Sequence, residues 1–373
     1  MAGSSHPLMR LLSQLRHHRS TVLLASICSV VNKVWDLAPP VLIGMAIDVV
    51  ATQEDSFLAQ FGYPDVYDQL YILTGITVVV WVLESIFQYI YAVLWRNLAQ
   101  TAQHELRMSA YTHIQDLEMQ WYSEQSTGSL MAILNDDVNQ LERFLDQGAT
   151  DLLHVATTII VVGAIMISVA PEVALLAIMP VPIIVAGSFI YQRRIGARYT
   201  KVRSKVADLS ALLNNNLHGI MTIKSFTAEE REVERVSDAS VSYREANRDA
   251  IRLSASFVPI IRMAILFAFT ANMLVGGWFA LDGRISLGAY SVIVFITQRL
   301  LWPLTRLGET FDLYQRAMAS TTRVLDLLDT EIGIVEGDTE LDVVRGEIRF
   351  SEVGFSYPNR EVVLRGADFA VPA

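Results

Sequence analysis

The sequence predicts an all-α membrane protein with six transmembrane helices, long cytoplasmic extensions of those helices and a short β segment at the C-terminus. Of its 373 residues, 52% are hydrophobic and 18% are charged, a composition too apolar for an ordinary soluble domain. Six apolar runs each approach or exceed the ~20 residues that cross a ~30 Å hydrocarbon core. The long polar stretches are almost free of proline, which favours continuous helices over irregular loops.

The first segment, residues 1–20, is expected to be an amphipathic helix on the membrane surface. Leucines recur at helical spacing from Leu8 to Leu15, and arginines accompany them from Arg10 to Arg19. The alternative is a merely solvated N-terminus. The segment has no apolar core that ends at a cleavage site, so it is not a secretory signal, and the first span should remain in the membrane as an anchor.

The six predicted spans form a transmembrane domain over residues 21–329. Pro39 and Pro40 should kink the first span, because proline lacks the amide proton that a helix interior needs. Tight turns at Pro171 and Gly283 should join the third span to the fourth and the fifth to the sixth. The apolar runs are Val22–Val50, Leu70–Trp95, Leu152–Ala170, Val173–Tyr191, Leu253–Leu281 and Ile285–Leu307.

Basic residues indicate the orientation of the chain. The segment 51–69 contains no lysine or arginine, whereas the two long polar stretches contain many. The positive-inside rule therefore places both termini and the long stretches in the cytoplasm. We expect an integral multi-pass protein of a prokaryotic inner membrane, surrounded by lipid. The net charge of −10 disfavours a nucleic-acid partner.

The two long polar stretches are expected to extend the spans as helices well beyond the bilayer. A helix over residues 68–115 would be on the order of 70 Å long at ~1.5 Å per residue. Apolar residues recur every three or four positions over residues 130–145 and 202–220, as in coiled-coil seams. The tips of the two hairpins should lie near residues 116–130 and 217–230. Two glycines mark the expected interruptions, Gly128 and Gly219.

A second domain is expected to begin near the C-terminus. Helical spacing continues from Thr310 to Asp329, and glycines indicate a linker over residues 330–346. Over residues 347–373 apolar residues alternate, which is typical of β-strands. A segment this short cannot bury a core alone, so we expect the sequence to be a piece that ends early in this domain.

Five segments, in this order along the chain, resemble segments of ABC exporters. Trp121–Leu141 (WYSEQSTGSLMAILNDDVNQL) is similar to the first cytoplasmic loop of the family, and Leu217–Val236 (LHGIMTIKSFTAEEREVERV) is similar to the second. Gly283–Glu309 resembles the last span, and Arg323–Thr330 resembles the segment before the nucleotide-binding domain. Gly346–Ala373 resembles the first strands of that domain. On a chain with six spans, these segments together resemble the transmembrane domain of an ABC half-transporter.

The resemblance implies an ATP-driven translocase that forms a homodimer or a heterodimer with a second half-transporter. ATP and Mg would be bound by the nucleotide-binding domains of the complete protein. The 373 residues contain no G-x-x-x-x-G-K-[ST] loop, so we expect no catalytic residue in this chain and no ATP hydrolysis by it alone. The spacing of the histidines gives no support for a metal site.

The resemblance also assigns residues that contact nucleotide and the nucleotide-binding domains. Tyr357 matches the aromatic residue that stacks on adenine in the family. The tips of the hairpins would act as coupling helices that dock on the nucleotide-binding domains. The residues expected to make that contact are Trp121, Tyr122, Thr127, Gly128, Lys224, Ser225 and Phe226.

Polar residues inside the predicted spans are candidates for the translocation pathway, because charges are costly in hydrocarbon and usually face an interior cavity. The alternative is structural pairing, for example of Lys33 with Asp36 on one helical face. The candidates are Asn32, Lys33, Asp36, Glu84, Gln88, Arg262, Asn272, Gln298 and Arg299, with His154 as a further polar residue of the third span. Three tryptophans are expected as anchors at the membrane interface, Trp95, Trp278 and Trp302.

We expect the complete protein to export or flip a substrate by alternating access, with this chain supplying the translocation pathway. Two alternatives remain open at this point. One is a non-transporting receptor or regulator built on the same scaffold, and the other is a channel-like pore. The substrate could be a small molecule, a lipid or a peptide, because exporters of all these classes share the same patterns.

Overall fold

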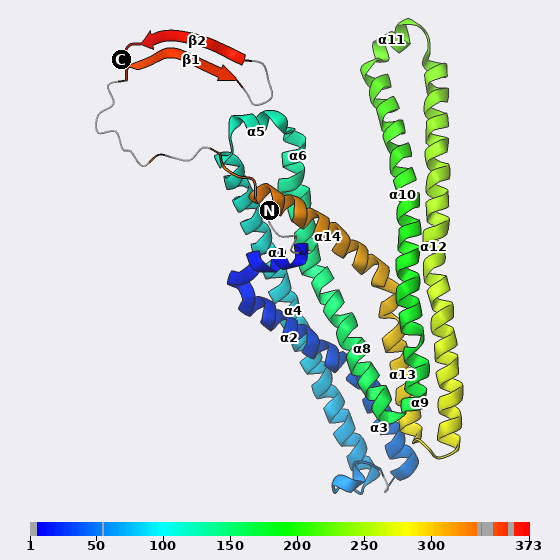
Figure 1. Cartoon of the computed structure of the whole chain (residues 1–373). Helices are drawn as coiled ribbons and strands as arrows, with labels where there is room; N and C mark the ends of the chain where they lie inside the picture. The colour runs from blue at the N-terminus through cyan, green and yellow to red at the C-terminus, as the bar shows by residue number, and fades with distance from the viewer. Residues whose placement is uncertain (1–5, 54–55, 334–336, 338–345, 357–361) are drawn as a thin grey trace. The chain divides into compact units, whose positions relative to one another are not determined.

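The computed structural model describes residues 6–53, 56–333, 337, 346–356 and 362–373, and it confirms the predicted fold class (Figure 1). Six helical stretches among these residues are long and apolar enough to cross a membrane. The chain divides into two compact units. The first unit comprises residues 1–16, 99–142 and 316–373, and the second comprises residues 17–98 and 143–315.

The helices follow the six predicted spans closely. The N-terminal helices are α1 (Pro7–Gln14), α2 (Arg19–Asp36) and α3 (Ala38–Thr52), followed by α4 (Val66–Asp116), α5 (Met119–Glu124), α6 (Thr127–Met131) and α7 (Val138–Arg143). They continue as α8 (Ala149–Val169), α9 (Pro171–Ile178), α10 (Pro180–His218), α11 (Ile220–Ser225), α12 (Glu229–Leu281), α13 (Leu287–Leu301) and α14 (Leu307–Leu328). The π-helical turns Ala132–Asp137 and Phe144–Gly148 connect α6, α7 and α8. The 3-10 turns are Leu15–His18, Ala59–Phe61 and Pro303–Arg306.

Prolines lie at several breaks of the spanning helices, although Pro259 lies inside the unbroken helix α12. The first span breaks at Leu37, immediately before Pro39 and Pro40, as predicted. Pro171 opens α9 and Pro180 opens α10, each within the first turn, where a missing amide proton leaves no hydrogen bond unmade. The short helix α9 therefore follows α8 directly.

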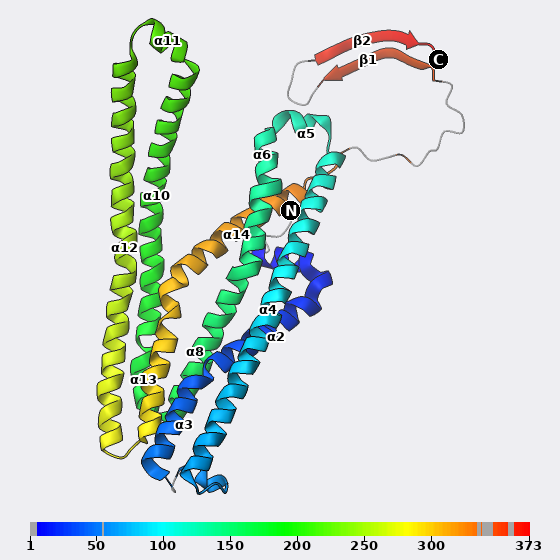
Figure 2. The ribbon, with the colours of Figure 1, turned by 180° about the vertical axis from the view of Figure 1, so that it is seen from behind.

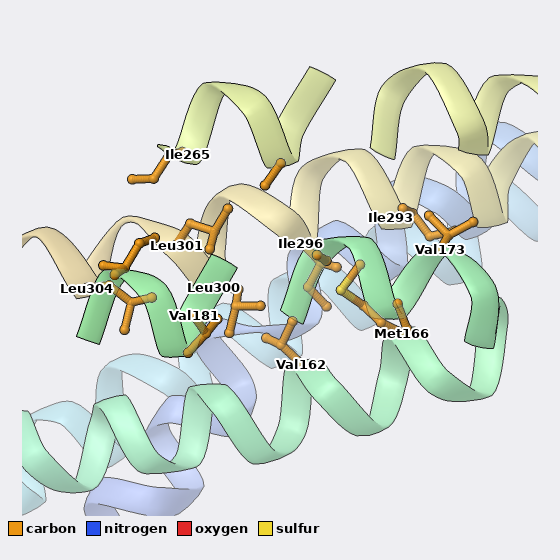
Figure 3. Close-up of a cluster of buried hydrophobic side chains, with 14 of the residues drawn as sticks. Val162, Met166, Val173, Val181, Ile265, Ile293, Ile296, Leu300, Leu301 and Leu304 are labelled. Atoms are coloured by element: carbon orange, nitrogen blue, oxygen red, sulfur yellow. The ribbon is translucent and has the colours of Figure 1, made fainter. Parts of the chain in front are cut away.

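The core of the second unit is an apolar cluster formed where α8, α9, α10, α12 and α13 meet. Figure 3 shows the side chains of Val162 and Met166 from α8 meeting those of Ile296 and Leu300 from α13. These four side chains are at most 1% exposed. Lipid is as apolar as these side chains, so close van der Waals packing, more than the hydrophobic effect, stabilises the cluster.

Two glycines allow α3 and α13 to cross at close range. A Cβ atom added to Gly288 would lie 2.1 Å from the carbonyl oxygen of Gly44. Asp48 of α3 completes the crossing: its carboxylate accepts from the amide of Gly288 at 2.6 Å and from the hydroxyl of Ser286 at 2.7 Å. Ser286 is itself the N-cap of α13. A negative charge at a helix N-terminus is favourable, so Asp48 holds the first and sixth spans together.

The helices α10 and α12 form a long hairpin whose tip is α11, and both views show the two helices side by side (Figures 1 and 2). With 53 residues, α12 is on the order of 80 Å long at ~1.5 Å per residue. Val202 packs against Ala246 and Ala250, all at most 7% exposed. Gly219 ends α10.

The predicted seam over residues 202–220 is closed along only part of its length. Val202 is buried, but Val206, Leu213 and Leu217 are 40%, 41% and 71% exposed. The apolar stripe is therefore present as predicted, but this chain covers only part of it. The small alanines of α12 cover only the start of the apolar stripe on α10. By contrast, Val138 and Leu141 of the seam over residues 130–145 are at most 1% exposed.

The first unit contains an apolar cluster of its own at the first hairpin. Ala110 and Ile114 of α4, with Leu117 directly after it, pack against Leu327 of α14. The chain turns between α5 and α6 at Gln125 and Ser126, where Ser126 caps α6. The prediction that Gly128 interrupts the helix was wrong, because Gly128 lies inside α6 and the capping serine sets the boundary. Residues Ile348–Ser356 (β1) and Val362–Val371 (β2) form an antiparallel pair in which Phe350 stacks on Phe369.

Replacing Gly288 by alanine should destabilise the protein, because the added methyl group would collide with the backbone of α3. Overpacking of this kind costs about 1–3 kcal/mol, which a lower midpoint of thermal unfolding in detergent would report. The matched control is Gly75→Ala in α4, where nothing lies within 4 Å of the added Cβ. Equal midpoints for the two variants would contradict the close crossing.

Candidate functional site

A cavity of about 790 Å³ opens between the spanning helices of the second unit. Helices α2, α3, α8 and α13 supply most of its wall, and the segment from Trp302 to Thr310 supplies the rest. The lining combines apolar and charged side chains: Lys33, Pro39, Pro40, Ile43, Asp151, His154, Val155, Thr158, Phe295, Gln298, Arg299, Trp302, Pro303, Thr305, Arg306 and Thr310. Three of the predicted pathway residues, Lys33, Gln298 and Arg299, therefore line one cavity.

Two cations on the wall of this cavity share one carboxylate. Nζ of Lys33 lies 2.6 Å from Oδ2 of Asp36, and Nη1 of Arg299 lies 3.0 Å from Oδ1 of the same residue. The side chains of Lys33 and Asp36 are 16% and 22% exposed, and that of Arg299 is 47% exposed. Glu84 on α4 interacts electrostatically with all three groups. The ion pairs connect the first span to the sixth.

Two other predicted pathway residues connect α2 to α4. Asn32 is buried, and its side-chain amide donates to the backbone carbonyl of Glu84 at 2.8 Å. Gln88, one turn further along α4, is exposed and is not part of the cavity lining. Asn32 thus connects α2 to α4 by a hydrogen bond, which agrees with the alternative of structural pairing between helices.

Arg262 and Asn272 of α12 do not line this cavity, and their assignment to the translocation pathway stays a prediction. Asn272 is 0% exposed, and its side-chain amide donates to Oγ1 of Thr297 at 3.0 Å. It joins α12 to α13, as polar residues between membrane helices often do. Arg262 is exposed, and its guanidinium lies 5.5 Å from the ring centre of Trp302.

The tryptophan prediction was partly wrong. Trp95 is 4% exposed, and its Nε1 donates to the hydroxyl of Ser29 at 3.0 Å, so it packs between helices and is not available as an interface anchor. Trp278 and Trp302 are 56% and 45% exposed.

Asp151 and Arg306 belong to the cavity but were missed in the sequence. Asp151 lies one turn before His154 on α8, and both line the cavity. The ring of His154 meets Tyr91 edge to face, with ring centres 5.4 Å apart. Asp151 lies one residue before the apolar run of the third span, and Arg306 lies at the C-terminal end of the sixth run. The three-residue spacing of Asp151 and His154 was the one signal that could have shown a polar face on α8.

At the first hairpin, the predicted coupling residues separate into two groups. Trp121 and Tyr122 are half-buried and pack against the apolar cluster of the first unit. The hydroxyl of Tyr122 donates to the carbonyl of Ile114 at 2.9 Å. Thr127 and Gly128 are exposed. The aromatic pair therefore stabilises the loop from within, while the start of α6 presents a free surface.

At the second hairpin, Lys224, Ser225 and Phe226 all lie at the exposed tip. Phe226 is 77% exposed, which is unusual for a phenylalanine outside the membrane. Nζ of Lys224 lies 2.9 Å from Oε1 of Glu229, an ion pair that spans the turn from α11 to α12. The turn thus carries one strongly exposed aromatic side chain beside an internal ion pair.

The profile of the ABC transporter transmembrane region matches residues 22–304. The chain belongs to this family. It is 27% identical to the uncharacterised ABC transporter ATP-binding protein YknV of Bacillus subtilis (strain 168), over 98% of this chain and 59% of the relative. It is 25% identical to the multidrug efflux ATP-binding/permease protein Rv0194 of Mycobacterium tuberculosis (strain ATCC 25618 / H37Rv), over 98% of this chain and 30% of the relative.

A third relative is the multidrug resistance-like ATP-binding protein MdlA of Buchnera aphidicola subsp. Schizaphis graminum (strain Sg), which is 22% identical over 87% of this chain and 54% of the relative. The chain therefore spans between 30% and 59% of the length of these three relatives. The match and these relatives identify the spanning helices as an exporter-type ABC transmembrane region.

Two predictions from the sequence, about adenine and metal binding, concern residues outside the cavity of this ABC transmembrane region. Tyr357, the expected adenine contact, lies outside the described residues. Among the residues that the structure describes, no group of three or more His, Cys, Asp or Glu side chains could hold a metal ion.

Replacing Asp36 by asparagine should destabilise the ABC transmembrane region, because Lys33 and Arg299 would lose their shared anion. Leaving a partly buried charge unpaired costs about 2 kcal/mol, which would lower the midpoint of thermal unfolding. The matched control is Asp208→Asn, which breaks an exposed pair with Lys205 within α10 and should cost less than about 1 kcal/mol. Removing Lys33 as well, as Lys33→Gln, should restore part of the loss. Equal effects of Asp36→Asn and Asp208→Asn would mean that the cavity pair is solvated like a surface pair.

Proposed function

We propose that the complete protein is an ATP-driven exporter, and that this chain supplies its translocation pathway and its contacts with the nucleotide-binding domains. The observation that carries the proposal is the cavity of about 790 Å³ that Lys33, Gln298 and Arg299 line from within the spanning helices. Charged side chains within apolar spans are costly in hydrocarbon, so their position on a cavity wall favours a polar route between the helices. Transport would require this cavity to open alternately to the two sides of the membrane.

The exposed tip of the second hairpin supports the proposed coupling role. Phe226, Met221 and Leu217 are 77%, 77% and 71% exposed at the end of a long helical arm. Exposed apolar side chains in this position are suited to docking into a pocket of a partner domain. We assign that pocket to a nucleotide-binding domain. At the first hairpin the docking surface would be Thr127 and Gly128, with Trp121 and Tyr122 holding the loop in shape.

The remaining parts of the proposal concern the complete protein. Two half-transporters, identical or different, would form the working dimer, with both termini in the cytoplasm of a prokaryotic cell. The 373 residues contain no phosphate-binding loop, so no residue of this chain is assigned to the phosphates of ATP or to Mg. Tyr357 would stack on adenine. Two relatives are named for multidrug efflux or resistance, which makes an aromatic organic cation a suitable first transport probe.

The variant Phe226→Ala should hydrolyse ATP but export less substrate per ATP. The side chain is strongly exposed, so its removal should leave the fold intact. The full-length protein would be reconstituted in liposomes, and ATP-dependent accumulation of ethidium would be measured alongside phosphate release. A control of similar exposure is Tyr67→Ala at the start of α4, which is 73% exposed and far along the chain from either tip.

Unchanged transport per ATP in Phe226→Ala would contradict the coupling role of the tip. The unmodified protein would also be tested with a panel of cationic, anionic and lipid probes. If it hydrolyses ATP but moves none of them, the exporter hypothesis is contradicted and the alternative of a non-transporting regulator is favoured. ATP-independent flux of the probes would favour the channel-like pore.

A further inference from the structure

A buried carboxylate connects the first cytoplasmic hairpin to the last helix of the first unit. Asp137 ends the π-helical turn before α7 and is 6% exposed. It accepts from Nε of Arg323 at 2.7 Å, from Nη2 of the same guanidinium, and from the hydroxyl of Ser320 at 2.8 Å. Arg323 and Ser320 both belong to α14. Three donors from one helix therefore converge on one side chain of another.

The geometry of this contact differs from that of an ordinary surface ion pair. Two nitrogens of one planar guanidinium meet the two oxygens of one carboxylate, which fixes the relative orientation of the groups as well as their distance. Breaking an exposed pair costs little stability, whereas breaking a buried pair is strongly destabilising. Asp137 is buried while the side chain of Arg323 remains 55% exposed, so the cost of disruption should fall between these limits.

The same end of α14 is held by further contacts within the first unit. Leu327 packs on Ala110 and Ile114 of α4. Nε2 of His113 donates to the carbonyl of Thr330 at 2.9 Å. The guanidinium of Arg10, on α1, pairs with Asp326 at 2.8 Å and with Asp329 at 2.7 Å. The chain leaves this cluster at Thr330 and continues toward the β-strands.

These contacts have different mechanical properties. Leucine contacts are non-directional, so two helices that touch through them can slide or turn with little change in energy. A bidentate arginine–carboxylate pair resists both movements, because either one breaks a charged hydrogen bond. The π-helical turn that ends at Asp137 changes the direction in which this side chain projects from the hairpin, and such turns are frequent at functional sites.

We propose that Asp137 and Arg323 form a positioning pair that transmits movement between α14 and the first cytoplasmic hairpin. This inference rests on the proposed function, in which the domain that begins at β1 binds and hydrolyses ATP. Rotation of that domain turns α14, and the pair forces α7 to follow. The adjoining helix α8 forms part of the cavity wall, so the movement reaches the translocation pathway. Without the pair, ATP is hydrolysed but the cavity does not change its access.

The test uses the full-length protein in liposomes with a single reporter cysteine in the cavity. Cys28→Ser removes the native thiol, and Ile43→Cys places the reporter at a cavity-lining position that is 43% exposed. Two quantities are measured, the rate of phosphate release and the rate at which an impermeant maleimide labels the reporter with and without ATP and vanadate. In the background protein, nucleotide should change the labelling rate severalfold.

The central variant is Asp137→Asn, which keeps the volume of the side chain but removes its charge. Coupling free energies between sites correspond to roughly 5- to 150-fold effects, so the nucleotide-dependent change in labelling should fall at least about fivefold, while phosphate release changes less. Asp137→Glu, which can still accept from both nitrogens, should retain part of the change. Asp208→Asn on α10, in an exposed pair, should behave like the background protein.

Parallel losses of hydrolysis, labelling change and thermal stability in Asp137→Asn would indicate a merely structural role and overturn the proposal. Should Asp137→Asn not fold, Arg323→Lys decides, because it keeps the charge but cannot form the two parallel hydrogen bonds. Normal labelling change in Arg323→Lys would also overturn the proposal. Absence of hydrolysis or of any nucleotide effect in the background protein would contradict the proposed function itself, separately from the positioning pair.

Discussion

A backbone that crosses hydrocarbon must satisfy its own hydrogen bonds, and this constraint explains the length and continuity of the spanning helices. Each of the six spanning stretches is far longer than the ~20 residues that the hydrocarbon core requires. The extra length forms the arms of the two hairpins. Some breaks occur where a proline begins a new helix, as Pro180 does for α10. Others occur where a residue caps the next helix, as Ser126 does for α6.

Lipid supplies no hydrophobic force between apolar helices, so a few directed contacts decide which helices become neighbours. Asp48 caps α13 from α3, Asn272 joins α12 to α13, and Asn32 reaches the backbone of α4. Each contact uses a polar group that would be costly to expose to lipid. The glycine pair Gly44 and Gly288 adds close backbone approach at one of these crossings. The cavity lies beside such contacts, because helices held at defined points leave defined space between them.

The two long hairpins differ in how much of their apolar surface this chain covers. The first hairpin closes its apolar seam at Val138 and Leu141 and is tied to α14 by Asp137. The second is a two-helix arm whose apolar stripe remains open at Leu213 and Leu217. Exposed apolar surface of this kind is unfavourable in water and suits contact with another chain or domain. The first hairpin is therefore anchored within its own chain, whereas the second carries an apolar stripe that this chain leaves exposed.

The sequence by itself determined the six spans, their turns and the two long hairpins, because hydrophobic period, proline and glycine act locally. It also indicated Lys33, Gln298 and Arg299 as cavity residues, since charges in apolar runs are conspicuous. Tertiary structure decided the rest. It showed that Asn272 and Trp95 are buried between helices, that Asp151 joins the cavity, and that Asp137 meets Arg323 across 186 residues of sequence. Periodicity shows which face of a helix is polar or apolar. It does not show which other helix that face meets, because the choice of neighbour depends on how all the helices pack together.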